Sequence, residues 1–218
     1  MSAAAESPRC PYCGVLLKVR PQRKKLCPEC KRPIFVKGTP NNREGRLMTE
    51  AQAEEAERQW NAYHAKAQAI SVLRSFGLNE HDLVKEQSHG AKSENEALVA
   101  LLTRIAVTSS DPQIRGMAYY QLATLADREG RKFVDLLREK ARCELLSLKQ
   151  SGVVPKVKIV NNSPVTPCVA CVARIGEVLS IDDALRIMPL PCRTCTCTLL
   201  GEQSGFCRCS YEAVFDDE

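Results

Sequence analysis

Cysteine is the residue type with which this 218-residue chain could do chemistry, and the 12 cysteines fall into two dense groups. A two-residue gap between cysteines lets both sulfurs of a tight turn point at one ion, as tetrahedral Zn²⁺ requires. The C-terminal pairs Cys168/Cys171 and Cys192/Cys195 therefore predict one closed structural zinc site. The segments P-C-V-A-C, P-L-P-C-R-T-C-T-C and F-C-R-C together contain Cys168, Cys171, Cys192, Cys195, Cys197, Cys207 and Cys209.

Three of these residues, Cys197, Cys207 and Cys209, leave the number of C-terminal ions open. Two tetrahedral ions have eight ligand places, and seven thiolates fill them only if one sulfur bridges. The alternatives are one zinc with three spare thiols, or a second ion completed by another group. The single zinc is marginally favoured. Disulfides would need an oxidising compartment, of which the rest of the sequence gives no sign.

The N-terminal group has the spacing of a zinc ribbon. The segments C-P-Y-C-G and C-P-E-C-K stand thirteen residues apart and contain Cys10, Cys13, Cys27 and Cys30. We expect a strand from Val15 to Arg20 to pair with a segment that begins at Ile34. Because so small a unit buries little surface, a bound ion must supply its stability. The whole chain is thus expected to bind two or three Zn²⁺ ions.

Basic residues are concentrated around the predicted ribbon. Residues 9–46 contain 11 Lys and Arg but only two Glu, whereas the whole chain has a net charge of +5. The remainder of the chain is therefore acidic. A basic hairpin can contact phosphate backbones, and the alternative is a solvated hairpin that docks on another protein. The candidate nucleic-acid-binding residues are Arg20, Arg23, Lys24, Lys25, Lys31 and Arg32.

The order of features in the C-terminal group resembles the C-terminal end of phage head-morphogenesis proteins of the Mu F type. C-x-x-C is followed by Gly176, a short predicted strand and helix, Leu190–Pro191 and C-x-x-C-x-C. That family usually ends in H-P-x-C-R-C, so Cys192 stands where a His is usual, and the F-C-R-C extension has no counterpart. The resemblance covers about 35 of 218 residues and implies a phage or prophage origin.

A helical body is predicted between the two cysteine groups. Capping signals at Thr49, Ser93 and Asp111 begin helices, and the pattern from residue 133 to residue 148 predicts another. We expect a four- or five-helix bundle, with Pro40 to Gly45 as the linker before it. Cys143 is expected to be a small core residue.

The C-terminal region should add strands to this body. Apolar and other residues alternate over residues 153–160 as in a strand. Ser180 caps a short helix, and the segment from Thr196 can form a further strand. The predicted fold is therefore mainly α. A helical bundle (47–152) is flanked by an N-terminal zinc ribbon (1–46) and a C-terminal cysteine-rich zinc-binding α+β module (153–218).

The sequence contains no recognised catalytic motif, such as a P-loop, G-x-S-x-G or H-E-x-x-H. We therefore expect that the protein is not an enzyme. The N-terminus lacks signal-peptide character and no apolar run is long enough to span a membrane, which predicts a cytoplasmic or virion location. Two functional classes remain. The favoured class is a structural or assembly protein of a phage head or connector, which binds other protein subunits and can form homo-oligomers. The alternative is a nucleic-acid-binding adaptor or regulator that contacts DNA through the ribbon.

Overall fold

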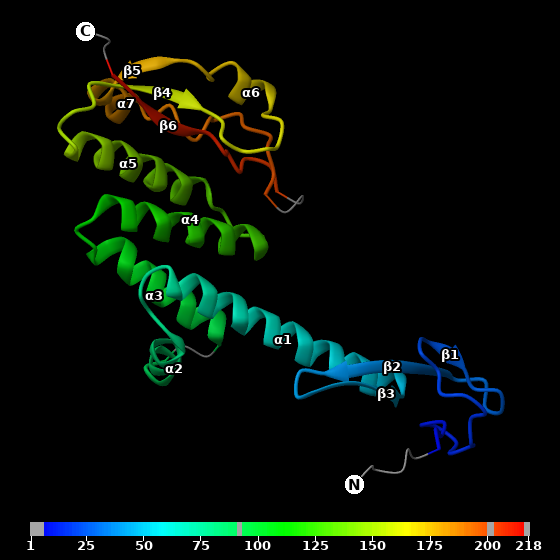
Figure 1. Ribbon diagram of the computed structural model, residues 1–218. Helices are drawn as coiled ribbons and strands as arrows, with labels where there is room; N and C mark the ends of the chain where they lie inside the picture. Colours follow the sequence, from blue (N-terminus) through cyan, green and yellow to red (C-terminus); the bar gives the residue numbers. More distant parts are fainter. Residues whose placement is uncertain (1–6, 91–92, 200–202, 216–218) are drawn as a thin grey trace. The chain divides into compact units, whose positions relative to one another are not determined.

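The computed structural model describes residues 7–90, 93–199 and 203–215, which contain seven helices and six strands (Figure 1). The chain divides into two compact units, Met1–Ser71 and Val72–Glu218. The predicted division into domains at residues 46 and 152 stays a prediction, and hydrophobic clusters span both positions. Among the described residues, no helix combines the length and the apolar character needed to cross a membrane.

The first unit contains an antiparallel three-stranded sheet of β1 (Lys25–Leu26), β2 (Pro33–Thr39) and β3 (Asn42–Met48), in that order. The expected strand from Val15 is wrong, because only an isolated bridge between Leu16 and Arg9 forms there. Instead, Ile34 of β2 lies opposite Lys25.

The predicted linker at residues 40–45 is also wrong, because it contains the turn and the first residues of β3. Thr39 lies opposite Asn42, so that Pro40 and Asn41 connect the strands of a hairpin. Pro40, the two asparagines and Gly45 gave this segment the composition of a linker, and the same residue types also form hairpin turns. An edge strand also tolerates charged residues because one of its faces meets solvent.

Helix α1 (Glu50–Arg74) begins at the predicted capping box. The Gln52 amide nitrogen donates to Thr49 Oγ1 at 3.3 Å, and the Thr49 amide nitrogen donates to Gln52 Oε1 at 3.0 Å. Buried Ala53 and Ala56 then pack with Met48 at the end of β3. The start of α1 is therefore part of the first unit's packing.

Trp60 connects α1 to the β2–β3 hairpin through a hydrogen bond. Its indole nitrogen donates to the Gly38 carbonyl oxygen at 3.0 Å. The His64 ring stacks on the Trp60 ring, with 5.4 Å between the ring centroids. Trp60 and His64 are therefore packing residues of the first unit.

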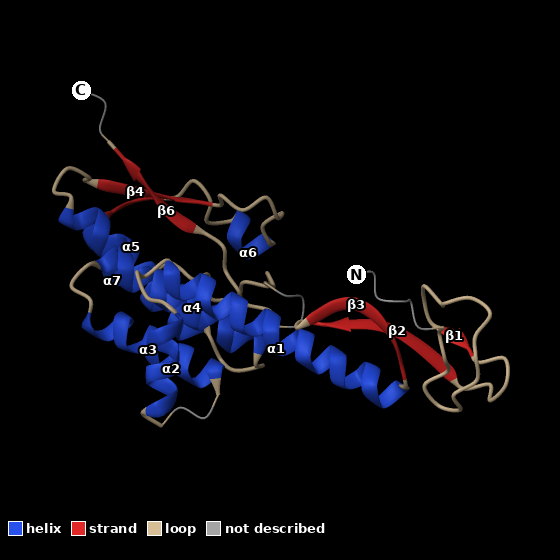
Figure 2. Ribbon diagram, turned by 60° about the horizontal axis from the view of Figure 1, so that its bottom comes forward, coloured by secondary structure: helices blue, strands red, loops and turns tan. Residues whose placement is uncertain are grey.

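Four helices of the second unit pack in chain order, α2 on α3, α3 on α4 and α4 on α5 (Figures 1 and 2). The predicted caps of α3 and α4 at Ser93 and Asp111 are confirmed. Helix α2 was not predicted, although its capping box, Asn79 with Asp82, is the sequence signal that could have found it. The four elements are α2 (Glu80–Ser88), α3 (Glu94–Thr108), α4 (Pro112–Arg128) and α5 (Val134–Gln150).

Helices α4 and α5 approach closely where Gly116 faces Cys143. A Cβ atom placed on Gly116 would lie 3.2 Å from the Cβ atom of Cys143. Cys143 is fully buried, so its prediction as a small core residue is confirmed.

The C-terminal part forms an antiparallel sheet in the order β5–β4–β6. Its elements are β4 (Lys156–Val160), α6 (Val169–Val172), β5 (Val178–Ser180), α7 (Ile181–Ile187) and β6 (Ser210–Val214). The Ser180 cap and the strand before residue 160 are confirmed. The strand expected from Thr196 is wrong. Residues 196–199 are irregular, and β6 takes the place beside β4.

Helix α5 shares one hydrophobic core with this sheet. Ala141 and Leu145 of α5 are buried in the same cluster as Val157 and Ile159 of β4. Because this cluster spans residue 152, the helices and the cysteine-rich module form one compact unit.

Phe206 is a second connection between the helices and the cysteine-rich segment. Its side chain is fully buried, and its ring centroid lies 5.2 Å from that of Phe133 and 5.9 Å from that of Tyr120. It follows Gly205, whose φ of +103° favours glycine, and directly precedes Cys207. The position of Cys207 therefore depends on the helical core.

We predict that Phe206→Ala lowers the free energy of unfolding of the second unit by about 3–5 kcal/mol. The substitution leaves a cavity where the segment before Cys207 packs on Tyr120 and Phe133. Urea unfolding monitored by circular dichroism measures this change. Phe215→Ala is the matched control, since Phe215 is 60% exposed and its removal should change stability by less than about 0.5 kcal/mol. Equal effects of the two substitutions would contradict the role given to Phe206.

Candidate metal centres

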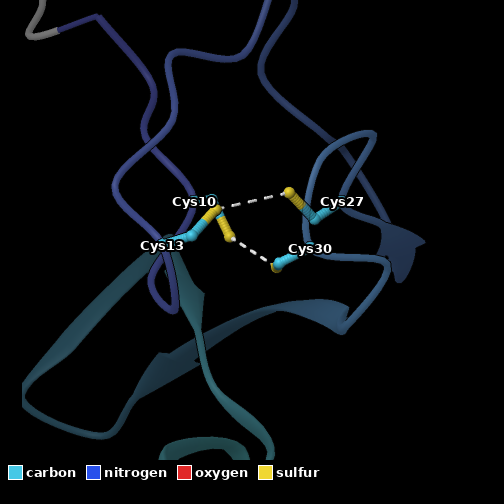
Figure 3. Close-up of side chains that lie close together, drawn as sticks. All are labelled: Cys10, Cys13, Cys27 and Cys30. Atoms are coloured by element: carbon cyan, nitrogen blue, oxygen red, sulfur yellow. Dashed lines mark hydrogen bonds between the residues drawn. The ribbon is translucent and has the colours of Figure 1, made fainter.

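The ribbon cysteines converge on one point from two loops (Figure 3). Cys10 Sγ lies 3.8 Å from Cys30 Sγ, and Cys13 Sγ lies 3.8 Å from Cys27 Sγ. All four sulfurs lie within 4.8 Å of one another. The structure thus brings together the four ligands that the sequence predicted for this site.

The same backbone turn builds both knuckles of the ribbon. The amide nitrogen of Gly14 donates to the Cys10 carbonyl at 2.9 Å, and that of Lys31 donates to the Cys27 carbonyl at 3.1 Å. Both donors have positive φ, +74° for Gly14 and +61° for Lys31. Lys31 therefore accepts a conformation that costs a non-glycine residue about 1–2 kcal/mol. The turn it completes sets the spacing of the sulfurs.

The seven C-terminal cysteines form two groups of four that share one member. Cys171 belongs to both, and its sulfur lies 3.6 Å from Cys195 Sγ in one group and 3.8 Å from Cys207 Sγ in the other. The first group is Cys168, Cys171, Cys195 and Cys197, and the second is Cys171, Cys192, Cys207 and Cys209.

This grouping corrects the predicted ligand set, which placed Cys192 and Cys195 on one ion. The amide nitrogen of Cys195 does donate to the Cys192 carbonyl at 3.0 Å, as in a knuckle, but the two sulfurs join different groups. The reason is the return of the chain after residue 203, which brings Cys207 and Cys209 beside Cys192. Sequence spacing describes the turn of a knuckle but not where a distant segment returns.

The distances fit a tetrahedral ion bound by four thiolates. Zn–S bonds of about 2.3 Å place the corners of a tetrahedron about 3.8 Å apart, as the closest sulfur pairs are here. A disulfide would need an S–S distance of about 2.05 Å, and all 12 cysteines are free thiols. Each group could therefore hold a metal ion, although tetrahedral sulfur coordination suits iron as well as zinc.

Proton affinities at the C-terminal sulfurs follow from their crowding. Thiol hydrogen bonds from Cys192, Cys195 and Cys209 lower the pKa of Cys207, and the pKa of Cys195 is raised chiefly because its own thiol donates to Cys207. Burial opposes the Cys168 thiolate, yet the backbone N–H of Thr196, 3.4 Å from the sulfur, helps to lower the pKa of Cys168 to about 6. Metal ions bound by these sulfurs must therefore displace protons.

Several of the predicted nucleic-acid-binding residues make contacts within the first unit. Lys24 Nζ lies 4.6 Å from the centroid of the Phe35 ring, and Arg32 Cζ lies 5.3 Å from that of Tyr12. Lys31 Nζ donates to the Pro28 carbonyl at 2.6 Å. Arg23 and Lys25 are exposed, with Lys25 on β1. Lys24, Lys31 and Arg32 therefore also make contacts inside the unit.

Arg20 instead lies with two arginines that the sequence did not single out. A groove of about 720 Å³ is lined by Arg9, Arg20 and Arg46, together with Ser7, Pro8 and Leu47. Arg20 Nη2 donates to the Gly45 carbonyl at 2.6 Å, and Arg9 Nη1 donates to the Gly14 carbonyl at 3.2 Å. Each guanidinium keeps further donors, because it has five N–H groups. The groove is a candidate anion site.

A pocket of about 570 Å³ lies between α4, α5 and β6. It contains the ion pair of Lys140 Nζ and Glu144 Oε1, which are 2.5 Å apart, and burial raises the pKa of Glu144. The Tyr211 hydroxyl also lines it and has no hydrogen-bond partner among the described residues. Neither a cysteine nor a histidine is among the residues that line the pocket.

Comparisons with protein-family models, with curated proteins and with solved structures returned no match to this chain. Its function must therefore be argued from its own residues.

We predict that Cys13→Ser lowers the bound metal by one ion per chain and unfolds the ribbon, since too little core remains there without the ion. Helical circular dichroism should persist, because most helices lie in the second unit. Cys143→Ser is the matched control, as Cys143 lies outside all three groups and should leave the metal content unchanged. Loss of most helical signal in Cys13→Ser would contradict the independence of the two units.

Proposed function

We propose that this protein is a zinc-stapled structural protein that serves as a head- or connector-associated component of a phage or prophage. The observation that carries the structural role is the closure of the three cysteine groups. Each offers four sulfurs at tetrahedral spacing. A catalytic zinc keeps a position open for water or substrate, whereas four protein ligands leave none.

The location of the groups supports the same role. The buried core of the ribbon consists of Cys10 and Cys27 together with Leu17 and Ile34, so the ligands are themselves half of that core. The C-terminal cysteines belong to the core cluster that α5 shares with the sheet. Ions in these positions hold chain segments together.

The assembly part of the proposal is supported by the C-terminal resemblance. After the first C-x-x-C, the chain runs through Gly176, with a φ of +90°, into β5 and α7, and then through Leu190–Pro191 to the next cysteines. This order of elements is the one that the resemblance to Mu F-type head-morphogenesis proteins led us to expect.

Two measurements test this proposal. Elemental analysis of protein purified without added metal should find zinc, up to three ions per chain, and little iron. Mass spectrometry of particles purified from lysates of the host that encodes the chain should detect it at a fixed ratio to the major capsid protein. Its absence from such particles, with zinc present, would reject the assembly role and leave the structural role of the ions intact.

A second candidate function is nucleic-acid binding by the first unit. The observation that favours it is the groove of Arg9, Arg20 and Arg46, which brings three guanidinium groups together, and no acidic residue is among the described residues that line it. Arginine binds phosphate in a bidentate manner, so such a groove suits a phosphate backbone. In a DNA-packaging particle, this activity and the assembly role are compatible.

Replacing Arg9, Arg20 and Arg46 together by Gln should weaken binding to duplex DNA and reduce the slope of log K against log salt by about 2.7, since each phosphate contact contributes about 0.9. The matched control is the Lys18, Arg23 and Lys25→Gln triple variant, which removes the same charge from exposed positions of the same unit. Fluorescence anisotropy at several salt concentrations measures both. Equal losses in the two variants would exclude the groove as the binding site.

A further inference from the structure

Cys171 has a position that no other cysteine shares among the described residues, because it belongs to both C-terminal groups. Cys171 is 1% exposed, and its sulfur lies 3.6 Å from Cys195 Sγ in one group and 3.8 Å from Cys207 Sγ in the other. The two candidate centres are therefore neighbours that meet at one atom.

We propose that the C-terminal module holds a binuclear metal–thiolate cluster in which Cys171 Sγ bridges two ions. This inference rests on the proposed zinc-binding role and specifies how two of the ions are held. One ion is bound by Cys168, Cys195 and Cys197, the other by Cys192, Cys207 and Cys209, and the bridging thiolate completes both tetrahedra.

The ligand count leads to this arrangement. Two tetrahedral ions need eight ligand places, and a single bridging thiolate lets seven cysteines fill all of them. Both groups consist of cysteine alone, with no carboxylate or imidazole among their members. A single ion would leave three free thiols at tetrahedral spacing around a second point, where Cys192, Cys207 and Cys209 are all buried.

Charge supports the same arrangement. Seven thiolates and two divalent ions carry a net charge of −3, which a buried site must compensate. Arg208 lies between the ligands Cys207 and Cys209 in the sequence, and its guanidinium donates to the Thr198 carbonyl at 2.6 Å and to Ser163 Oγ at 3.3 Å. Its Nε is buried and has no hydrogen-bond partner among the described residues. The chain thus fixes a cation beside the cluster.

The bridge makes the two ions depend on each other. Removal of Cys171 takes a ligand from both, whereas removal of any other C-terminal cysteine takes a ligand from one. A change at this residue should therefore cost the chain two ions.

Cadmium-113 NMR of the full chain, loaded with ¹¹³Cd²⁺ in place of the native metal, tests the bridge without any substitution. We expect three resonances, two of them split by mutual coupling through the shared sulfur and the third, from the ribbon, a singlet. Three uncoupled resonances, or only two resonances, would overturn the bridge while leaving thiolate metal binding in place. A spectrum with no C-terminal resonance would reject the proposed zinc-binding role there as well.

Native mass spectrometry of variants gives an independent test. The expected counts are one ion per chain for Cys171→Ser, two for Cys197→Ser and three for Cys143→Ser, which removes a thiol from outside the groups. Equal counts for Cys171→Ser and Cys197→Ser would contradict the bridge. Circular dichroism of each variant separates loss of an ion from general unfolding, and the cadmium spectrum of the unmodified chain decides the matter if Cys171→Ser does not fold.

Discussion

The crowding of sulfur around a few points is the constraint on which the rest of this structure depends. Sulfur atoms meet at 3.6–3.8 Å in the three cysteine groups, and the same cysteines form much of the buried core on either side of the helices. Thiolates at this separation repel one another unless a cation lies between them. Ion binding by these groups would therefore be coupled to core formation. Cysteine makes up half of the buried ribbon core, and the C-terminal cysteines share their core with apolar residues such as Val157 and Ile159 of β4.

The two C-terminal centres differ in how they depend on the rest of the chain. The ligands Cys168, Cys171, Cys195 and Cys197 all lie within the part that resembles the Mu F-type proteins, whereas the second centre needs Cys207 and Cys209 from the F-C-R-C extension. Contacts with the helical body hold the F-C-R-C extension in place, because Phe206 packs on Phe133. The second group therefore depends on the packing of the helical body, whereas the first is built from residues 168–197.

Local features of this fold could be predicted from the sequence, and long-range ones could not. The knuckle spacing singled out eight of the eleven grouped cysteines, and the caps at Ser93, Asp111 and Ser180 located helices, because each signal acts within a few residues. The division of Cys192 from Cys195 depends on where residues 203–209 return. The arginine groove likewise joins residues from separate segments, 9, 20 and 46, which no local pattern connects.

Solvent exposure differs between the two ends in a way that matters under oxidising conditions. Cys13 of the ribbon is exposed, whereas none of the seven C-terminal cysteines is. Oxidants and chelators attack accessible thiolates first, since susceptibility follows thiolate character and exposure. An ion bound by the ribbon would thus be the more accessible one to chelators. In the C-terminal groups five of the seven cysteines are buried, and Cys168 and Cys197 are the half-buried positions through which an oxidant would reach them.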